Sequence, residues 1–300
     1  MSPQDMSSSQ GHSTSPALLV RSFGVTDPGR KRPTNEDQFL VAELTKAMQI
    51  SQTSLSQPSS LLGEQKGHLF LVADGMGGHS AGEEASRLAV ESIEAFTVNA
   101  LKWFLQRNDP SAGSAAAEFT EAIEEADRAV IKEAENSPDL QGMGTTLTVG
   151  YVVNAQLFVA HVGDSRAYLH RDGSLSQLTR DHSYVADLLR AGAIRPEEAY
   201  RHPLRHVITN VIGGTAAGVR AESHTIDLRP GDRLLLCSDG LTDMISAEEI
   251  AAGLAAETNP EIACRRLVDL ANERGGHDNI TVIVAQFESA EAVEATASGQ

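Results

Sequence analysis

The feature that most constrains this chain is an apolar run, Leu69–Ala73, that stops abruptly at Asp74 and a cluster of glycines. The run is long enough to form one buried strand. The glycines that follow break the strand and let the backbone approach another group closely. The sequence therefore predicts an aspartate at the point where a buried strand becomes a turn.

The same arrangement recurs, because two further apolar runs lead to an aspartate and two others begin just after acidic residues. The carboxylates at these further positions are Glu36, Asp37, Asp164, Asp239 and Asp278. Carboxylates at several strand edges can converge at one end of a sheet, where like charges repel unless they are protonated or neutralised by cations. Divalent metal ions are the natural counter-charge for such a cluster.

Carboxylate and carbonyl oxygens favour Mg²⁺ or Mn²⁺ as the bound metal. Two such ions, about 3.5–4 Å apart, can share one water and lower its pKa enough to yield hydroxide near neutral pH. Asp74 could bridge both ions, and Gly75 presents its carbonyl without a side chain in the way. A single Asp-Gly pair after a strand is usually a turn, so the repetition of the pattern is what favours a metal centre.

Three cations, Arg30, Lys31 and Arg32, come just before the first acidic pair. A guanidinium can bind a phosphate through two parallel hydrogen bonds, which makes this stretch a candidate phosphate site. A solvated basic loop is the simpler interpretation of any one of these residues. Arg166 is expected to fix local structure instead.

The composition, 41% hydrophobic and 22% charged over 300 residues, is that of a globular protein with a sizeable core. The formal net charge of −17 argues against a nucleic-acid partner, which needs clustered cations. No stretch is apolar enough to predict a membrane span, and the Ser/Gln-rich start does not read as a signal peptide. The two cysteines, Cys237 and Cys264, match no zinc or disulfide pattern, so a cytoplasmic location is expected.

One catalytic domain, residues 18–288, is expected between a disordered arm at 1–17 and an acidic tail at 289–300. A Ser/Gln-rich insertion is expected at about 49–60, and short helices and loops form a flap at about 181–211. Asn154–Ala155 and Asp172–Gly173 predict tight hairpin turns, and hairpins imply antiparallel pairing. Two long helices have one apolar face each, made by Ala85, Leu88, Ala89, Ser92, Ile93 and Phe96 in the first and Phe119, Ala122, Ile123, Ala126 and Val130 in the second.

Six later strands are predicted, with two helices at about 247–257 and 260–273. The strands are Thr145–Val153, Leu157–Val162, Ala167–His170, Glu222–Asp227, Arg233–Cys237 and Ile280–Phe287. Helices packed on antiparallel sheets, without regular βαβ alternation, give an α+β fold.

These residues carry a family resemblance, because seven short motifs occur along the chain in the same order as in one known protein family. The motifs are Arg32-Pro-Thr-Asn-Glu-Asp37, Val72-Ala-Asp-Gly-Met-Gly-Gly78, Gly144-Thr-Thr146, Val162-Gly-Asp-Ser-Arg166, Leu178-Thr-Arg-Asp-His-Ser183, Cys237-Ser-Asp-Gly-Leu241 and His277-Asp-Asn-Ile-Thr281. The chain resembles a type-2C, metal-dependent protein serine/threonine phosphatase (PPM family) of the bacterial kind, from about residue 20 to residue 287. The resemblance implies a central antiparallel β-sandwich flanked by helix pairs, in four layers α-β-β-α.

The resemblance also implies a site that holds two Mn²⁺ or Mg²⁺ ions. Its metal ligands would be Asp74, Gly75, Asp239 and Asp278, and its metal-bound water would be held by Glu36 and Asp37. Arg32 takes the phosphate-binding position, and Asp164 matches the ligand of a third, weaker metal. The implied reaction is hydrolysis of phosphoserine or phosphothreonine on proteins by a metal-bridging hydroxide, in opposition to a partner serine/threonine kinase.

One position departs from the animal members, which carry a histidine, proposed as general acid, where this chain has Met76. Methionine cannot transfer a proton, so the proton donor to the leaving group is unassigned. Bacterial relatives commonly carry Met there too, so the departure does not exclude activity.

Other functions remain open on the sequence alone. Gly78–Gly82 fits the G-x-S-x-G pattern of a serine hydrolase with Ser80 as nucleophile, although the strand is expected to end too early, at Ala73. Ser80 fits the start or cap of a helix better, with Glu83 three residues on. A nucleotide-binding loop lacks its lysine and third glycine, and a catalytically dead binding module would not need the full ligand set.

Overall fold

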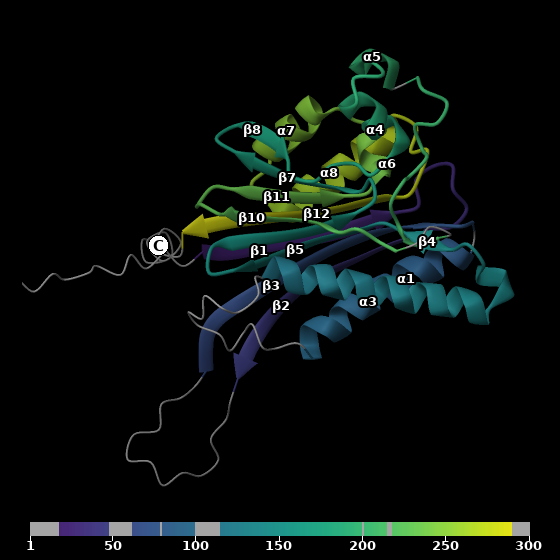
Figure 1. The fold of residues 1–300 in the computed structure, drawn as a ribbon. Helices are drawn as coiled ribbons and strands as arrows, with labels where there is room; N and C mark the ends of the chain where they lie inside the picture. The colour runs from purple at the N-terminus through teal and green to yellow at the C-terminus, as the bar shows by residue number, and fades with distance from the viewer. Residues whose placement is uncertain are drawn as a thin grey trace, which may run out of the picture.

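The computed structural model describes residues 18–47, 62–78, 80–99, 115–199, 201–214 and 218–289. Two antiparallel sheets pack face to face, and helices cover the outer face of each sheet (Figure 1). This is the expected α-β-β-α sandwich. The predicted arm, the predicted Ser/Gln-rich insertion and nearly all of the predicted tail lie outside the described residues.

The first sheet has five strands. The first and the last described strands of the chain lie side by side in it and pair with each other. The order is β1 (Leu18–Asp27), β12 (Ile280–Ser289), β11 (Arg233–Cys237), β7 (Arg166–Arg171) and β8 (Ser174–Gln177). β1 pairs with β12 along its whole length, from Leu18 opposite Ser289 to Asp27 opposite Ile280.

The second sheet is built around one long strand, β3. Its order is β10 (Glu222–Asp227), β6 (Gln156–Val162), β5 (Leu147–Val153), β3 (Leu62–Met76), β4 (Gly144–Thr145) and β9 (Ile212–Gly213), and β2 (Asp37–Ala47) pairs with β3. The predicted end of β3 at Ala73 is wrong, because Gly75 and Met76 continue the ladder opposite Thr145 and Gly144.

The predicted single strand 145–153 is likewise wrong, since it divides into β4 and β5 at Thr146. This threonine leaves the ladder to hold the backbone of Asp74: its N–H donates to the Asp74 carbonyl (2.9 Å), and its Oγ1 accepts from the Asp74 N–H (3.0 Å). The break therefore fixes the backbone where the predicted metal ligand lies.

Both hairpin turns are confirmed by backbone conformation. Asn154 and Ala155 have φ of 49° and 59°, and Asp172 and Gly173 have φ of 51° and 78°. Positive φ at both central residues is what a tight two-residue hairpin turn requires.

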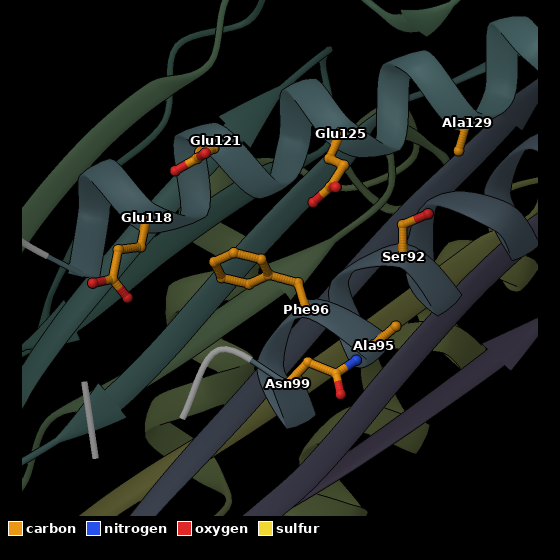
Figure 2. Close-up of a pocket in the computed structure, with 8 residues that line it drawn as sticks. All are labelled: Ser92, Ala95, Phe96, Asn99, Glu118, Glu121, Glu125 and Ala129. Carbon is orange, nitrogen blue, oxygen red and sulfur yellow. The ribbon is translucent and has the colours of Figure 1, made fainter. Parts of the chain in front are cut away.

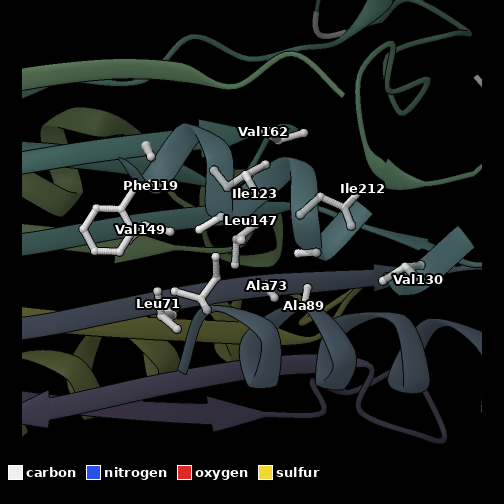
Figure 3. Close-up of a cluster of buried hydrophobic side chains, with 14 of the residues drawn as sticks. Leu71, Ala73, Ala89, Phe119, Ile123, Val130, Leu147, Val149, Val162 and Ile212 are labelled. Carbon is white, nitrogen blue, oxygen red and sulfur yellow. The ribbon is translucent and has the colours of Figure 1, made fainter. Parts of the chain in front are cut away.

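Helices α1 (Ser80–Asn99) and α3 (Ala115–Asn136) cover the second sheet with their predicted apolar faces. Ala85, Ala89 and Ile93 of α1 are buried, as are Phe119 and Ile123 of α3. Figure 3 shows part of this layer, where the side chains of both helices meet those of the sheet.

Alternation along β3 explains why two cores share one strand. Leu69, Leu71 and Ala73 face the α1–α3 layer, whereas Phe70 and Val72 face the other sheet. Successive side chains of a strand point to opposite faces, so an apolar run without polar interruptions marks a strand buried on both sides.

The first sheet is covered by α6 (Asp239–Thr242), α7 (Ala247–Ala256) and α8 (Pro260–Glu273). α7 begins with a capping box, in which the Ser246 and Glu249 side chains each bond the other's backbone N–H. The predicted flap contains α4 (Tyr184–Arg190) and α5 (Pro196–Ala199), and the 3₁₀-helix η1 (Pro138–Leu140) follows α3. Among the described helices, none combines the length and apolar character needed to cross a bilayer.

Candidate metal centre

The predicted carboxylates come together where the two sheets meet at one end. Asp37 begins β2 and lies directly opposite Asp74 of β3. Asp239 follows β11 at the start of α6, and Asp278 lies just before β12, so this pair comes from the other sheet. Burial and the negative charges of Asp37, Asp239, Asp164 and Asp278 raise the pKa of Asp74 well above its usual range.

Asp37 links the two sheets through one carboxylate oxygen. Its Oδ2 accepts hydrogen bonds from Ser238 Oγ (2.8 Å) and Thr281 Oγ1 (2.6 Å), both on the first sheet side. Its Oδ1 is buried and has no hydrogen-bond partner. Burial raises the pKa of Asp37 to about 6, although the two hydroxyl donors oppose that rise.

Asp164 has a second buried oxygen of this kind. Its Oδ1 has no hydrogen-bond partner. Burial, followed by the charge of Asp181, raises the pKa of Asp164 to about 7, and Arg166 opposes the rise. Arg166 itself is committed to a two-point ion pair with Asp181 (2.8 and 2.5 Å), which confirms its expected structural role.

The donor set fits divalent cations. Leaving a buried polar oxygen without a partner is costly, and Asp37 and Asp164 each carry one. The pKa of Asp239 is raised by burial and then by Asp164, Asp243 and Asp278. Asp74 and Asp239 keep some surface exposure, so a cation can reach them while neighbouring charges still perturb them. Hard cations satisfy unpaired carboxylate oxygens and offset the mutual repulsion.

Close backbone approach brings Glu36 to the same place. A Cβ on Gly75 would lie 2.2 Å from the Gly82 carbonyl oxygen and 2.6 Å from that of Glu36, and a Cβ on Gly82 would lie 1.9 Å from Glu36 Oε2. The Glu36 N–H donates to Asn279 Oδ1 (2.9 Å), and Ser86 Oγ donates to the Glu36 carbonyl (2.6 Å). Glycine at 75 and 82 is therefore what lets α1, β3 and Glu36 meet.

Arg32 reaches the cluster from the loop between β1 and β2. Its Nη2 donates to Asp278 Oδ2 (2.7 Å), and about half of its side chain is exposed (54%). The hydrogen bond to Asp278 raises the pKa of Arg32. The structure thus brings Arg32 to the predicted ligands, with part of its guanidinium facing solvent.

Two residues that the sequence did not assign to the site, His206 and Asp243, lie beside Asp239. His206, on the flap, has its Nδ1 3.8 Å from Asp243 Oδ2. One potential ligand atom from each of His206, Asp239 and Asp243 lies within 4.8 Å of the others. The spacing of Asp239 and Asp243, one helical turn apart, was the available signal, whereas nothing local to His206 predicted its place.

The alternative nucleophile Ser80 is the first residue of α1 and is exposed. The expected role of Ser80 at the helix start is confirmed. A serine-hydrolase elbow places its serine in the sharp turn between strand and helix, whereas here Ser80 already belongs to the helix.

A cavity of about 620 Å³ lies away from the carboxylates, between α1 and α3. Figure 2 shows Phe96 of α1 between the helices and three glutamates of α3, Glu118, Glu121 and Glu125, along one side. None of the residues that line it belongs to the predicted site.

Comparisons with known proteins agree with this geometry. The family model described as protein phosphatase 2C matches residues 49–273. The chain is 42% identical over 219 residues to the serine/threonine protein phosphatase PstP of Mycobacterium tuberculosis, which covers 72% of this chain but only 40% of the length of PstP. It is 34% identical over 269 residues to the serine/threonine phosphatase stp of Listeria innocua, covering 87% of this chain and 93% of that protein.

Solved structures give the same picture. A crystal structure of the M. tuberculosis PstP phosphatase superposes with a TM-score of 0.71 at 36% identity, covering 91% of this chain and all of that one. The PstP catalytic domain in complex with two manganese ions superposes with a TM-score of 0.70 at 34% identity and the same coverage. The sandwich of two sheets, the convergent aspartates and these matches together show that the chain belongs to the protein phosphatase 2C family of serine/threonine phosphatases.

Proposed function

We propose that this chain hydrolyses phosphoserine and phosphothreonine on proteins with two Mn²⁺ or Mg²⁺ ions, and that residues 18–288 form the catalytic domain. The observation that carries the proposal is the buried, unpartnered Oδ1 of Asp37 among carboxylates that raise one another's pKa. Asp74, Asp239, Asp278 and the Gly75 carbonyl would hold the two ions. Asp164 would hold a third, weaker one.

The bound cations would act as Lewis acids that lower the pKa of water and offset charge on the phosphoryl oxygens. Glu36 and Asp37 orient the attacking water, and Asp37 is itself held by Ser238 and Thr281. Water attacks phosphorus directly, and the ester oxygen takes its proton from a donor other than Met76, which has none to give. No covalent enzyme intermediate forms.

Arg32 positions the phosphate in this scheme. Its guanidinium is half-exposed beside Asp278, so it can donate to a phosphoryl oxygen that arrives from solvent. Guanidinium donors match the geometry of phosphate oxygens.

The proposed substrates are proteins phosphorylated by a partner serine/threonine kinase, and the proposed location is the cytoplasm. Support for the location comes from Cys237 and Cys264, which are both buried as free thiols. Free thiols persist in reducing compartments.

The direct test is hydrolysis of phosphothreonine peptides with and without Mn²⁺ after exhaustive chelation. Activity should vanish on chelation and return with Mn²⁺ or Mg²⁺. Full activity in verified metal-free protein would overturn the proposal, and labelling of Ser80 by a fluorophosphonate would support the hydrolase alternative instead.

A further inference from the structure

A second, smaller cavity lies beside the flap and has the opposite electrostatic character to the metal centre. Its volume is about 250 Å³. We name it the arginine pocket, and its lining residues are Arg180, His182, Arg190, Arg220, Ala221 and Glu222. Three guanidinium groups gather here in a chain whose formal net charge is −17.

Three short segments within residues 180–222 build the arginine pocket. Arg180 lies in the loop after β8, Arg190 ends α4, and Arg220 lies just before β10. The side chains of Arg180 and Arg190 are 74% and 57% exposed. The guanidinium groups are therefore open to a ligand that arrives from solvent.

Two carboxylates oppose these three positive charges. Glu222 Oε1 lies 2.5 Å from His224 Nε2 and 3.8 Å from Arg180 Nε, and its Oε2 accepts from the Arg180 backbone N–H (3.0 Å). Asp187 pairs with Arg190 at 3.2 Å. Across the part of the chain that the structure describes, the Arg220 guanidinium forms no ion pair.

The main chain of Arg220 is held by the side chain of Asn210. Asn210 Nδ2 donates to the Arg220 carbonyl (2.7 Å), and the Arg220 N–H donates to Asn210 Oδ1 (3.1 Å). A residue whose N–H and carbonyl are both hydrogen-bonded presents its side chain from a defined position. Binding then costs less ordering entropy than it would from a loose loop.

The floor of the arginine pocket is tied to the candidate metal centre. His182 Nδ1 accepts from the Gly163 N–H (3.1 Å) and lies 3.0 Å from Asn210 Nδ2. The His182 ring lies 5.0 Å from that of the buried His161. Gly163 directly precedes Asp164, so the arginine pocket and the predicted third-metal ligand are fixed by adjacent residues of one backbone segment.

We propose that the arginine pocket binds a second oxyanion, a carboxylate or a phosphoryl group, on the phosphoprotein whose phosphoresidue enters the metal centre. Guanidinium groups bind both kinds of oxyanion through the same charge-assisted hydrogen bonds. The pocket thereby favours substrates that carry an acidic or a second phosphorylated side chain near the scissile phosphate. This specificity rests on the proposed phosphatase activity.

The test compares three phosphothreonine peptides. One has neutral flanking residues, one has flanking glutamates, and one has a flanking phosphoserine, with the anionic residue placed at varied spacing from the phosphothreonine. Arg220→Gln should lower kcat/KM for the anionic peptides about tenfold or more, mainly through KM, because a charge-assisted hydrogen bond contributes about 1.5–3 kcal/mol. Hydrolysis of the neutral peptide and of a small aryl phosphate should not change. The glutamate and phosphoserine arms show which oxyanion binds better.

Arg220→Lys should recover part of the loss, because it keeps the charge but not the planar fork. Arg229→Gln, which removes an exposed arginine beyond the far end of β10, is the matched control and should leave all substrates unchanged. Equal losses on the neutral peptide and the aryl phosphate would overturn the proposal and give Arg220 a structural role.

A binding measurement separates failure of this inference from failure of the proposed function. Fluorescence anisotropy of the labelled peptides on chelated, inactive wild-type protein should show tighter binding of the anionic peptides, and Arg220→Gln should remove that preference. Equal binding of all peptides to both proteins would overturn the arginine pocket even if the enzyme is an active phosphatase. If wild-type protein shows this binding preference but hydrolyses none of the peptides after Mn²⁺ is restored, only the phosphatase assignment is contradicted.

Discussion

Asp37 shows what a single residue contributes to this site. One of its oxygens is held by hydroxyls from the other sheet, while the other is buried without a partner. The first oxygen fixes the side chain, and the second is left for a ligand. Preorganisation of this kind lowers the cost of binding a cation, because the carboxylate does not need to be ordered again.

Asp239→Asn should weaken metal binding and turnover together while the fold survives. The metal-free variant should unfold at a higher temperature than wild type, because Asp164, Asp243 and Asp278 no longer face a fourth carboxylate. Thermal unfolding over a Mn²⁺ titration measures both effects. Asp269→Asn, on the exposed side of α8, is the control and should change neither. Wild-type turnover of Asp239→Asn at low metal would contradict its assignment as a ligand.

Arg32→Ala should reduce kcat/KM on a small aryl phosphate about ten- to a hundredfold, since one charge-assisted hydrogen bond is lost. Arg32→Lys should recover only part, because an ammonium cannot form the planar fork. Metal titration by calorimetry should show normal core affinity. Loss of the metals would instead mean that Arg32 serves chiefly as the partner of Asp278.

At the scale of elements, periodicity predicted α1 and α3 well, because each has one apolar stripe. The end of β3 and the division at Thr146 could not be predicted in this way. Both depend on backbone hydrogen bonds between segments about 70 residues apart, and these leave no periodic pattern. The clustered carboxylates were recognisable because they stand beside strands, whereas the positions of flap residues, including His206, depend on tertiary packing.

Ile123→Ala should lower the free energy of unfolding by about 2–5 kcal/mol, because Ile123 is fully buried between α3 and the second sheet. Denaturant unfolding measures the change. Glu124→Ala, on the exposed face of the same helix, should stay within about 0.5 kcal/mol of wild type. Activity per folded molecule should be preserved, because the proposed metal ligands lie on other elements. A specific loss of activity would show that α3 positions them.

Across the whole molecule, metal content and pH are linked through the carboxylates. Folded Asp37 and Asp164 keep their protons to about pH 6 and 7, whereas unfolded aspartates release theirs near 3.9. Their contribution to the stability of the metal-free protein is therefore present at low pH and is lost as pH rises through 4 to 7. A metal must displace these protons, so it binds better at higher pH.

The increase in unfolding temperature caused by Mn²⁺ should therefore be larger at pH 8 than at pH 5.5. Buried His161 has a pKa lowered to about 4, so its effect on the pH dependence of stability has the opposite sign. The stability that neutral His161 contributes to the fold is lost as pH falls from about 6.5 to 4. It contributes equally with and without metal, so it cancels in the comparison. Equal Mn²⁺ shifts at both pH values would contradict the proton–metal competition.

The pairing of β1 with β12 has a consequence for synthesis on the ribosome. β1 emerges first among the described strands, yet its partner at 280–289 is the last to be made. Asp278, directly before β12, is also the last of the clustered carboxylates to be added. A nascent chain therefore cannot complete the proposed metal centre until translation has passed residue 278 and that segment has left the exit tunnel. Chains that end between residues 227 and 278 would have no phosphatase activity, even though they already contain the whole second sheet and helices α1 and α3.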